Sequence, residues 1–187
     1  SISRYIIRYH FDQGVNFEHS SMPSLTVDPP IREKLPNLRI LIATIRDLDP
    51  ALVDAAGCTS LLATAWASAR DACAPLPNVQ SHPRIAAWRH AYQSLGIPTK
   101  KYTSSIENLV KRACKDGSTP RSICPLVDLY NACSLHCLVP FGGFDMQVDG
   151  GIGGGDLHLR WSRSGDTFHA LDGDGAVLCP KARQCMQ

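Results

Sequence analysis

The sequence predicts a mixed α/β fold of the α+β kind: a single domain with helices packed on a mostly antiparallel sheet. Three observations predict it. The chain of 187 residues is 44% hydrophobic and 19% charged, which is a globular composition long enough for one core. Apolar residues recur at helical spacing through the middle of the chain. From Phe141 onward, short alternating runs separated by many glycines replace that pattern.

The first two elements expected are a strand and a long helix. Residues 38–45 are apolar and rich in isoleucine, which predicts a buried strand. Asp49 and Pro50 then offer an N-cap and a first-turn proline. We therefore expect a helix over 51–73, which is rich in alanine and leucine and is loosened near Gly57.

Two further helices are predicted from their end signals. Pro83 opens one that runs to Gly96, a residue type that commonly ends helices. Ser104 and Glu107 form a capping-box pattern, in which the serine hydroxyl accepts from a free amide and the glutamate reaches back to the cap. That pattern predicts a third helix ending near Lys115.

The last helix and two strands complete the expected set. Pro125 starts a helical pattern that Pro140 closes. Residues 157–161 and 167–171 alternate between apolar and polar side chains and predict strands.

The sequence also predicts the bounds of the domain and the compartment in which it resides. Residues 1–21 precede the first methionine, and we treat them as an extension in front of a domain over 22–187. No segment approaches the roughly 20 apolar residues of a membrane span, and no export signal is visible. The eight cysteines include no C-x-x-C pair, so reduced thiols in a cytoplasmic protein are expected.

Basic residues are concentrated in one stretch of the chain. Residues 84–121 contain eight lysines and arginines but two acidic residues, a net charge of +6 in a chain whose net charge is +2. Such a stretch is a candidate surface for a polyanion, although on charge alone a solvated helix face explains it equally well.

One series of motifs carries a family resemblance. The series begins with His82-Pro-x-Ile-x-x-Trp88-x-x-x-Tyr92 and Lys101-Tyr-x-Ser-Ser-Ile-Glu107. It continues with Val127-Asp-Leu-Tyr-Asn131, Val139-Pro and Gly142-Gly-x-Asp145. In this order and spacing it resembles the B3/B4 domain, the tRNA-editing module of the bacterial phenylalanyl-tRNA synthetase beta subunit, and in particular the free-standing relatives of that module. The resemblance runs from about Leu25 to about Gly173.

The resemblance implies a reaction and a partner. The substrate would be a tRNA carrying the wrong amino acid, and the reaction would be hydrolysis in trans of the ester between that amino acid and the terminal ribose. No cofactor, metal ion, DNA or membrane is implied. An aminoacyl ester is already activated, so the protein needs to bind the 3′ end, place a water and stabilise an oxyanion.

The resemblance also assigns residues to the editing site. For catalysis, through the side-chain amide or backbone amides, it implies Asn131, Gly142 and Gly143. For the substrate pocket it implies Tyr130, Ser134, Asp145 and Asp128, where Asp128 has a structural alternative and Asp145 could instead fix its loop. For phosphate contacts the basic stretch supplies Lys100, Lys101, Lys111, Arg112 and Lys115.

The sequence departs from the family pattern at two places. The synthetase carries a histidine at the position of Gly142, so the identity of the amino acid removed does not carry over. After Gly173 the match ends where family members continue with further strands, so the C-terminal part of the domain is expected to be incomplete. These departures keep two alternatives open: a non-catalytic tRNA-binding module or inactive remnant, and a small-molecule-binding protein.

Two other motifs have weaker chemical interpretations. Cys133, His136 and Cys137 place three soft ligands on about one helical turn, but their spacing matches no common zinc site. The glycine-rich run 150–155 lacks the lysine and serine of a phosphate-binding loop and is more typical of a hairpin insertion.

Overall fold

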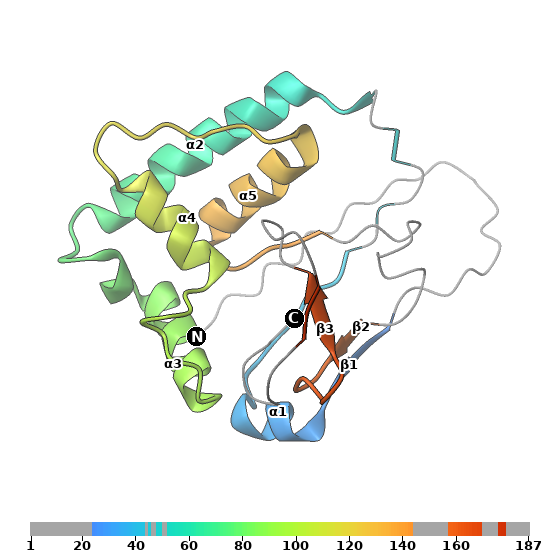
Figure 1. Cartoon of the computed structure of the whole chain (residues 1–187). Coiled ribbons are helices and arrows are strands. Elements are labelled where there is room, and N and C mark those ends of the chain that lie inside the picture. Colours follow the sequence, from blue (N-terminus) through green and yellow to red (C-terminus); the bar gives the residue numbers. More distant parts are fainter. Residues whose placement is uncertain are drawn as a thin grey trace.

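The computed structural model describes residues 24–43, 45, 48–49, 52–143, 157–169 and 176–178. Helices predominate in this part of the chain, and Figure 1 shows four of the five α-helices gathered on one side of the molecule. The α-helices are α1 (Pro29–Lys34), α2 (Ala55–Cys73), α3 (Pro83–Ser94), α4 (Ser105–Ala113) and α5 (Pro125–Cys137). A short 3-10 helix, η2 (Val79–Ser81), links α2 to α3.

The described strands form two small sheets. β1 (Leu25–Val27) pairs in parallel with β2 (Leu157–Leu159), with Thr26 opposite His158. β3 (Thr167–His169) pairs antiparallel with β4 (Ala176–Leu178). The prediction of one mostly antiparallel sheet is therefore wrong, although the fold remains a mixture of helices and strands.

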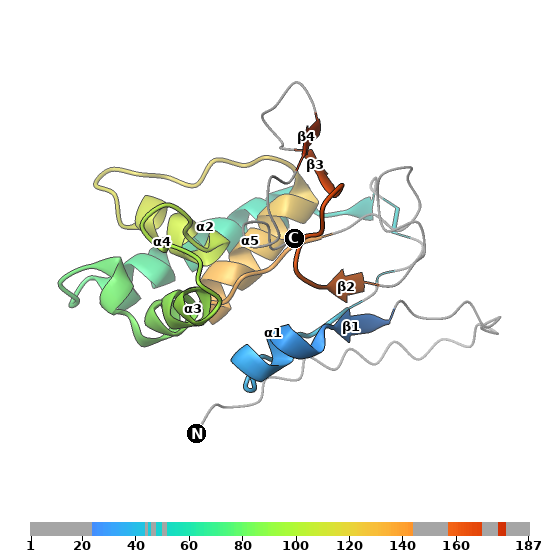
Figure 2. The ribbon, with the colours of Figure 1, turned by 60° about the horizontal axis from the view of Figure 1, so that its bottom comes forward.

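The core lies between helices rather than between helices and a sheet. Its fully buried side chains include Ile85 of α3, Ile106 and Val110 of α4, and Leu135 of α5. Helix α2 packs along α5 and contributes Leu62 to the same cluster. Burial of each such side chain contributes roughly 1.5–3 kcal/mol, so helix packing is the main source of stability. Seen from another side, α1 lies with β1 and β2 apart from this helical group (Figure 2).

Three helices begin and end where the local signals predict. Helix α3 begins at Pro83, after an N-cap at His82 whose Nδ1 accepts from the Arg84 amide at 3.3 Å. It is followed by Gly96 at φ +75°, a conformation that glycine adopts without steric cost. Helices α4 and α5 likewise start directly after Ser104 and Cys124.

The long helix begins later than predicted. Its N-cap is Asp54, whose carboxylate accepts from the Gly57 amide at 2.9 Å, and not Asp49. Asp54 and Asp49 are equally suitable cap residues, and the cap that forms is the one next to the first buried turn, which contains Cys58. The helix continues through Gly57 without interruption.

The predicted buried strand at 38–45 is also wrong. The described residues of this segment have no strand pairing, and three of their apolar side chains are exposed: 46% for Ile40, 73% for Leu41 and 61% for Ile45. An apolar sequence becomes a strand only where a neighbouring strand pairs with its backbone, and the part of the chain that the structure describes supplies none here.

The strands after the helical region match their predictions within the described residues. β2 and β3 lie inside the predicted segments 157–161 and 167–171. The expected extension at 1–21 and the glycine-rich run at 150–155 lie outside the described residues.

Candidate functional site

Helix α5 carries four of the predicted site residues, and Asp128 fixes the start of the helix. This carboxylate is 1% exposed and accepts from the Ser122 hydroxyl at 2.5 Å and from the Ile123 amide at 3.1 Å. The N-cap, Cys124, makes no side-chain bond to the helix, so Asp128 ties down the incoming chain in its place. These bonds support the structural alternative for Asp128.

The far end of α5 turns the chain back toward the helix. Leu138 adopts a left-handed conformation at φ +51°, which ends the helix. Ser134 is 1% exposed, and its hydroxyl donates to the carbonyl of Val139 at 2.6 Å. The Arg84 guanidinium donates to the carbonyl of Cys137. Ser134 thus fixes the turn, and its hydroxyl proton is committed to that bond.

The turn brings Gly143 back to helix α5 at Tyr130. A β-carbon built on Gly143 would lie 3.8 Å from Cδ1 and Cε1 of the Tyr130 ring, so the backbone of Gly143 faces that ring closely. Tyr130 and Asn131 are half-buried, whereas Gly142 and Gly143 are exposed. A β-carbon on Gly142 would meet nothing within 4 Å, which leaves its backbone approachable. Gly143 and Tyr130, two of the residues assigned by resemblance, are therefore close neighbours, and Gly142 and Asn131 are adjacent to them in the chain.

Other parts of the assigned set lie elsewhere or are not described. Asp145 lies outside the described residues. The five basic residues are all exposed and belong to α4 and to the segments flanking it. Two of them already have partners, because Lys111 pairs with Glu107 at 2.8 Å and Lys101 lies over the Tyr102 ring, 5.2 Å from its centre.

The sequence interpretation missed a buried ion-pair cluster between α3 and α4. Nη1 of Arg89 lies 2.9 Å from Oε1 and 3.1 Å from Oε2 of Glu107, whose side chain is 1% exposed. Nη2 of Arg89 donates to the Thr99 hydroxyl at 3.1 Å. The Ser104 hydroxyl accepts from the Glu107 amide at 3.3 Å, so one half of the predicted capping box is confirmed. The other half is replaced, because the Glu107 carboxylate is bound by Arg89 and Lys111.

One signal in the sequence could have revealed this cluster. Glu107 lies three residues before Val110 and next to Ile106, so it falls on the apolar face of α4. A carboxylate on a buried face requires a cationic partner, and Arg89 is the arginine nearest to it in the preceding helix.

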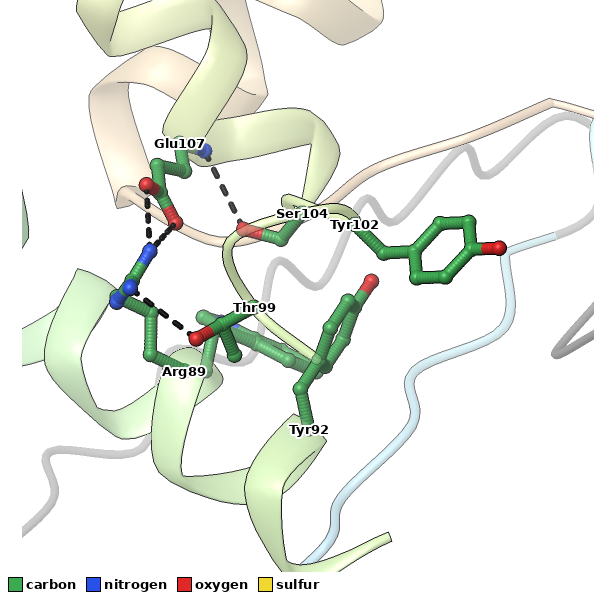
Figure 3. A pocket seen from close by; sticks show the side chains of 7 residues that line it. Arg89, Tyr92, Thr99, Tyr102, Ser104 and Glu107 are labelled. Carbon is green, nitrogen blue, oxygen red and sulfur yellow. Dashed lines mark hydrogen bonds and ion pairs between the residues drawn. The ribbon is translucent and has the colours of Figure 1, made fainter. Parts of the chain in front are cut away.

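A small recess adjoins the cluster, and three aromatic side chains line it. It is lined by Trp88, Arg89, Tyr92, Thr99, Tyr102, Ser104 and Glu107. Figure 3 shows the ion pair at one side of the recess and the rings of Tyr92 and Tyr102 at the other. Burial, and next the negative charge of Glu107, raise the pKa of the Tyr92 phenol. The empty volume is about 130 Å³ including open solvent, well below the roughly 300 Å³ at which ligand pockets begin.

The cysteines and histidines of the described residues form no metal centre. No group of three His, Cys, Asp or Glu side chains in that part of the chain is arranged to hold an ion. Cys133 and Cys137 both carry free thiols, and burial followed by the nearby Cys137 raises the pKa of Cys133. Among the helices that the structure describes, none is long and apolar enough to cross a membrane.

Fold and site together define a helical α/β domain in which α5 meets a glycine turn. The family model of the B3/4 domain matches residues 87–184, more than half of the chain, and this segment contains α4, α5 and the glycine turn. The chain therefore belongs to the B3/4 domain family.

Curated relatives show the same likeness over a shorter stretch. The chain is similar to the phenylalanine–tRNA ligase beta subunit of Nitrosospira multiformis, with 34% identity over 73 residues, which are 38% of this chain and 9% of that subunit. The subunit of the same name from Bordetella pertussis is 39% identical over 61 residues, 33% of this chain and 7% of the subunit. The chain thus spans less than a tenth of these relatives. No solved structure matches it.

Proposed function

We propose that this protein removes wrongly attached amino acids from tRNA, acting in trans as a free-standing editing domain. The observation that carries the proposal is the approach of Gly143 to the ring of Tyr130, the residue that precedes Asn131 in α5. This approach brings the glycine turn to the helix that also carries the side-chain amide of Asn131, and both the glycine backbone and the amide are hydrogen-bond donors. Membership of the B3/4 family and the likeness to phenylalanine–tRNA ligase beta subunits support a tRNA substrate.

The proposed reaction is a simple ester hydrolysis. Water attacks the carbonyl carbon that joins the amino acid to the ribose, and a negative charge develops on the carbonyl oxygen. The bond from that carbon to the ribose oxygen then breaks, and the ribose oxygen takes up a proton. The products are the free amino acid and an uncharged tRNA. Donors aimed at the developing oxyanion contribute about 10²- to 10³-fold to the rate of such reactions.

Each residue of the site has a distinct role in this proposal. Asn131 orients the attacking water through its amide, and the backbone amides of Gly142 and Gly143 stabilise the oxyanion. Tyr130 lines the space for the amino acid, and Asp145 receives its ammonium group. Asp128 and Ser134 are positioning residues, because their oxygens are bound to the loop before α5 and to the turn after it.

The exposed basic residues supply the affinity for the nucleic acid. Lys100, Arg112 and Lys115 are exposed in the stretch with the net charge of +6 and are placed to contact phosphates. Their contribution is expected to weaken as salt rises, because phosphate binding releases counterions. The cytoplasm, where charged tRNA is used, is the place of action that we propose.

A second candidate function is tRNA binding without catalysis. It is favoured by the absence of any side chain at Gly142, where the synthetase carries a histidine, and by the open space around that position. A module of this kind would bind tRNA through the same basic residues and leave the ester intact.

Incubation with a panel of mischarged tRNAs separates the two candidates. The protein, its Asn131→Ala variant and a control Asn37→Ala variant at an exposed turn are incubated with each tRNA, and release of the amino acid is followed. Hydrolysis of at least one tRNA by the protein and by Asn37→Ala, with loss in Asn131→Ala, supports the enzyme. Salt-sensitive binding with no release from any tRNA supports the binding module and refutes the enzyme.

A further inference from the structure

The recess between α3 and α4 combines an aromatic surface with a cationic edge. Tyr102 lies in the segment between the two helices, and Figure 3 shows its ring projecting away from the ribbon beside Tyr92. Lys101 lies over the same ring, with Nζ 5.2 Å from its centre, a cation–π geometry. Lys100 is exposed next to it. A flat ring and the ammonium group of Lys101 are therefore presented together, and the exposed Lys100 adds a second positive charge next to them in the chain.

The ion pair and its hydrogen bonds occupy the inner side of the recess. Arg89 has its donors on Glu107 and Thr99, and the Glu107 carboxylate also receives Lys111. The charge of Arg89 is thus balanced by Glu107, which makes this side of the recess a poor site for an incoming phosphate or carboxylate. The volume of about 130 Å³ cannot enclose a nucleoside or an amino acid, so a ligand has to lie across the outer edge, on the Tyr102 ring.

The charge around the recess selects the kind of ligand. Between 84 and 115 the sequence has one acidic residue, Glu107, which is 0% exposed and neutralised by two cations. The surface of this stretch is thus cationic without an exposed carboxylate. An acidic peptide would use the ammonium groups but not the ring, whereas a single-stranded nucleic acid uses both, through stacking of a base and through its phosphates.

We propose that Tyr102, with Lys100 and Lys101, forms a stacking site for one base of a single-stranded RNA end. The base lies on the Tyr102 ring, and the adjoining phosphate contacts the ammonium groups. Such a site tolerates any base, because every base has a face to stack. This inference rests on the proposed function, since it places the single-stranded end of the tRNA substrate on the segment that enters α4.

Binding of a short RNA tests the site without any ester chemistry. A fluorescein-labelled, uncharged oligoribonucleotide ending in CCA is titrated with the protein at low salt, and fluorescence anisotropy is measured. Tyr102→Leu is expected to weaken binding about 5- to 100-fold, the range that loss of one stacked base produces. Tyr102→Phe keeps the ring and is expected to bind within about twofold of the parent.

Charge variants and a competitor complete the test. Lys101→Gln is expected to weaken binding and to lower its salt dependence, whereas Lys34→Gln in α1, outside the basic stretch, leaves both unchanged. Circular dichroism and thermal melting establish that each variant is folded. Binding by folded Tyr102→Leu at the parent affinity overturns the proposal. Equal competition by a poly-glutamate peptide also overturns it and favours a peptide surface.

The outcomes separate this inference from the proposed function. If RNA binding depends on Tyr102 but no mischarged tRNA is hydrolysed, the stacking site stands and the enzyme does not. If mischarged tRNA is hydrolysed but Tyr102→Leu binds RNA like the parent, the enzyme stands and the stacking site does not.

Discussion

Glu107, whose side chain is buried, forms an ion pair with Arg89 between α4 and α3, with 2.9 Å between Oε1 and Nη1. It joins α3 to α4 and lines one side of the recess, and the rings of Tyr92 and Tyr102 line the other side (Figure 3). Since the carboxylate is inaccessible to water, its charge depends on Arg89 and on Lys111.

Removal of the buried carboxylate should destabilise the fold more than removal of the exposed cation Lys111 that also contacts it. Glu107→Gln leaves Arg89 without its counter-charge, and because that guanidinium is 24% exposed we expect a loss of about 2–3 kcal/mol in the free energy of unfolding. Lys111→Met removes a cation that is 39% exposed and should cost about 0–1 kcal/mol. Urea unfolding measures both. Equal losses in the two variants would contradict a buried Arg89–Glu107 pair.

The N-cap of α4 offers a matched pair of serines. Ser104 accepts from the Glu107 amide, whereas the neighbouring Ser105 is exposed at the first helical position. Ser104→Ala should lower the free energy of unfolding by about 1 kcal/mol, because an amide at the helix start loses its acceptor. Ser105→Ala should change it by less than about 0.5 kcal/mol. Thermal unfolding compares them, and a reversed order would exclude Ser104 as the cap.

Asp128 should matter for the attachment of the loop that precedes α5. Asp128→Ala leaves the Ser122 hydroxyl and the Ile123 amide without their acceptor, at an expected cost of about 2–3 kcal/mol. Asp128→Asn keeps one acceptor oxygen and should cost about half as much. Chemical unfolding of the two variants gives these values. If Asp128→Asn were folded like the parent but lost all hydrolysis, the carboxylate would act on the substrate instead.

Alkaline pH should destabilise the protein through Cys73. Burial, with smaller effects of the Cys114 thiol, raises the pKa of Cys73 to about 11 from the value of 9.0 in an open chain. The unfolded chain therefore loses this proton first, and stability present below about pH 9 is lost as the pH rises toward 11, by up to about 2 kcal/mol. Cys73→Ala should show a shallower decline in urea unfolding between these pH values. The exposed Cys124→Ala serves as control, and identical declines in all three proteins would contradict the shift.

Local signals in the sequence predicted the helices well because their causes are local. His82 and Pro83 start α3, Ser104 starts α4, and Gly96 ends a helix at positive φ, all through contacts within a few residues. The same reasoning predicted that the Glu107 side chain binds the N-cap of its own helix, α4. In the structure, the carboxylate binds Arg89 of α3 instead. A capping rule considers only neighbours in sequence, so it cannot predict a partner from another helix.

The sequence patterns did not predict which distant segments pair as strands. β1 pairs in parallel with β2 across more than a hundred residues, and Asp28 after β1 contacts His158 at 2.6 Å. Residues 38–45 have strand composition but no pairing partner among the described residues. Hydrophobic pattern determines whether a segment can form a strand, whereas the fold determines whether a partner is available. For the site, Tyr130 and Gly143 were named through the family resemblance, and their closeness in the structure follows from the short turn that separates them.

The rate of amino-acid release by Asn131→Ala tests the central claim most directly. A mischarged tRNA that the parent hydrolyses is mixed with excess enzyme, so that a single turnover is followed, and binding of uncharged tRNA is measured in parallel. The account predicts a fall in rate of about 10²-fold, the effect of removing one oriented dipole from such a site, with binding unchanged. Release by Asn131→Ala at the parent rate would contradict the account, because the helix and the glycine turn would then not form the reacting site.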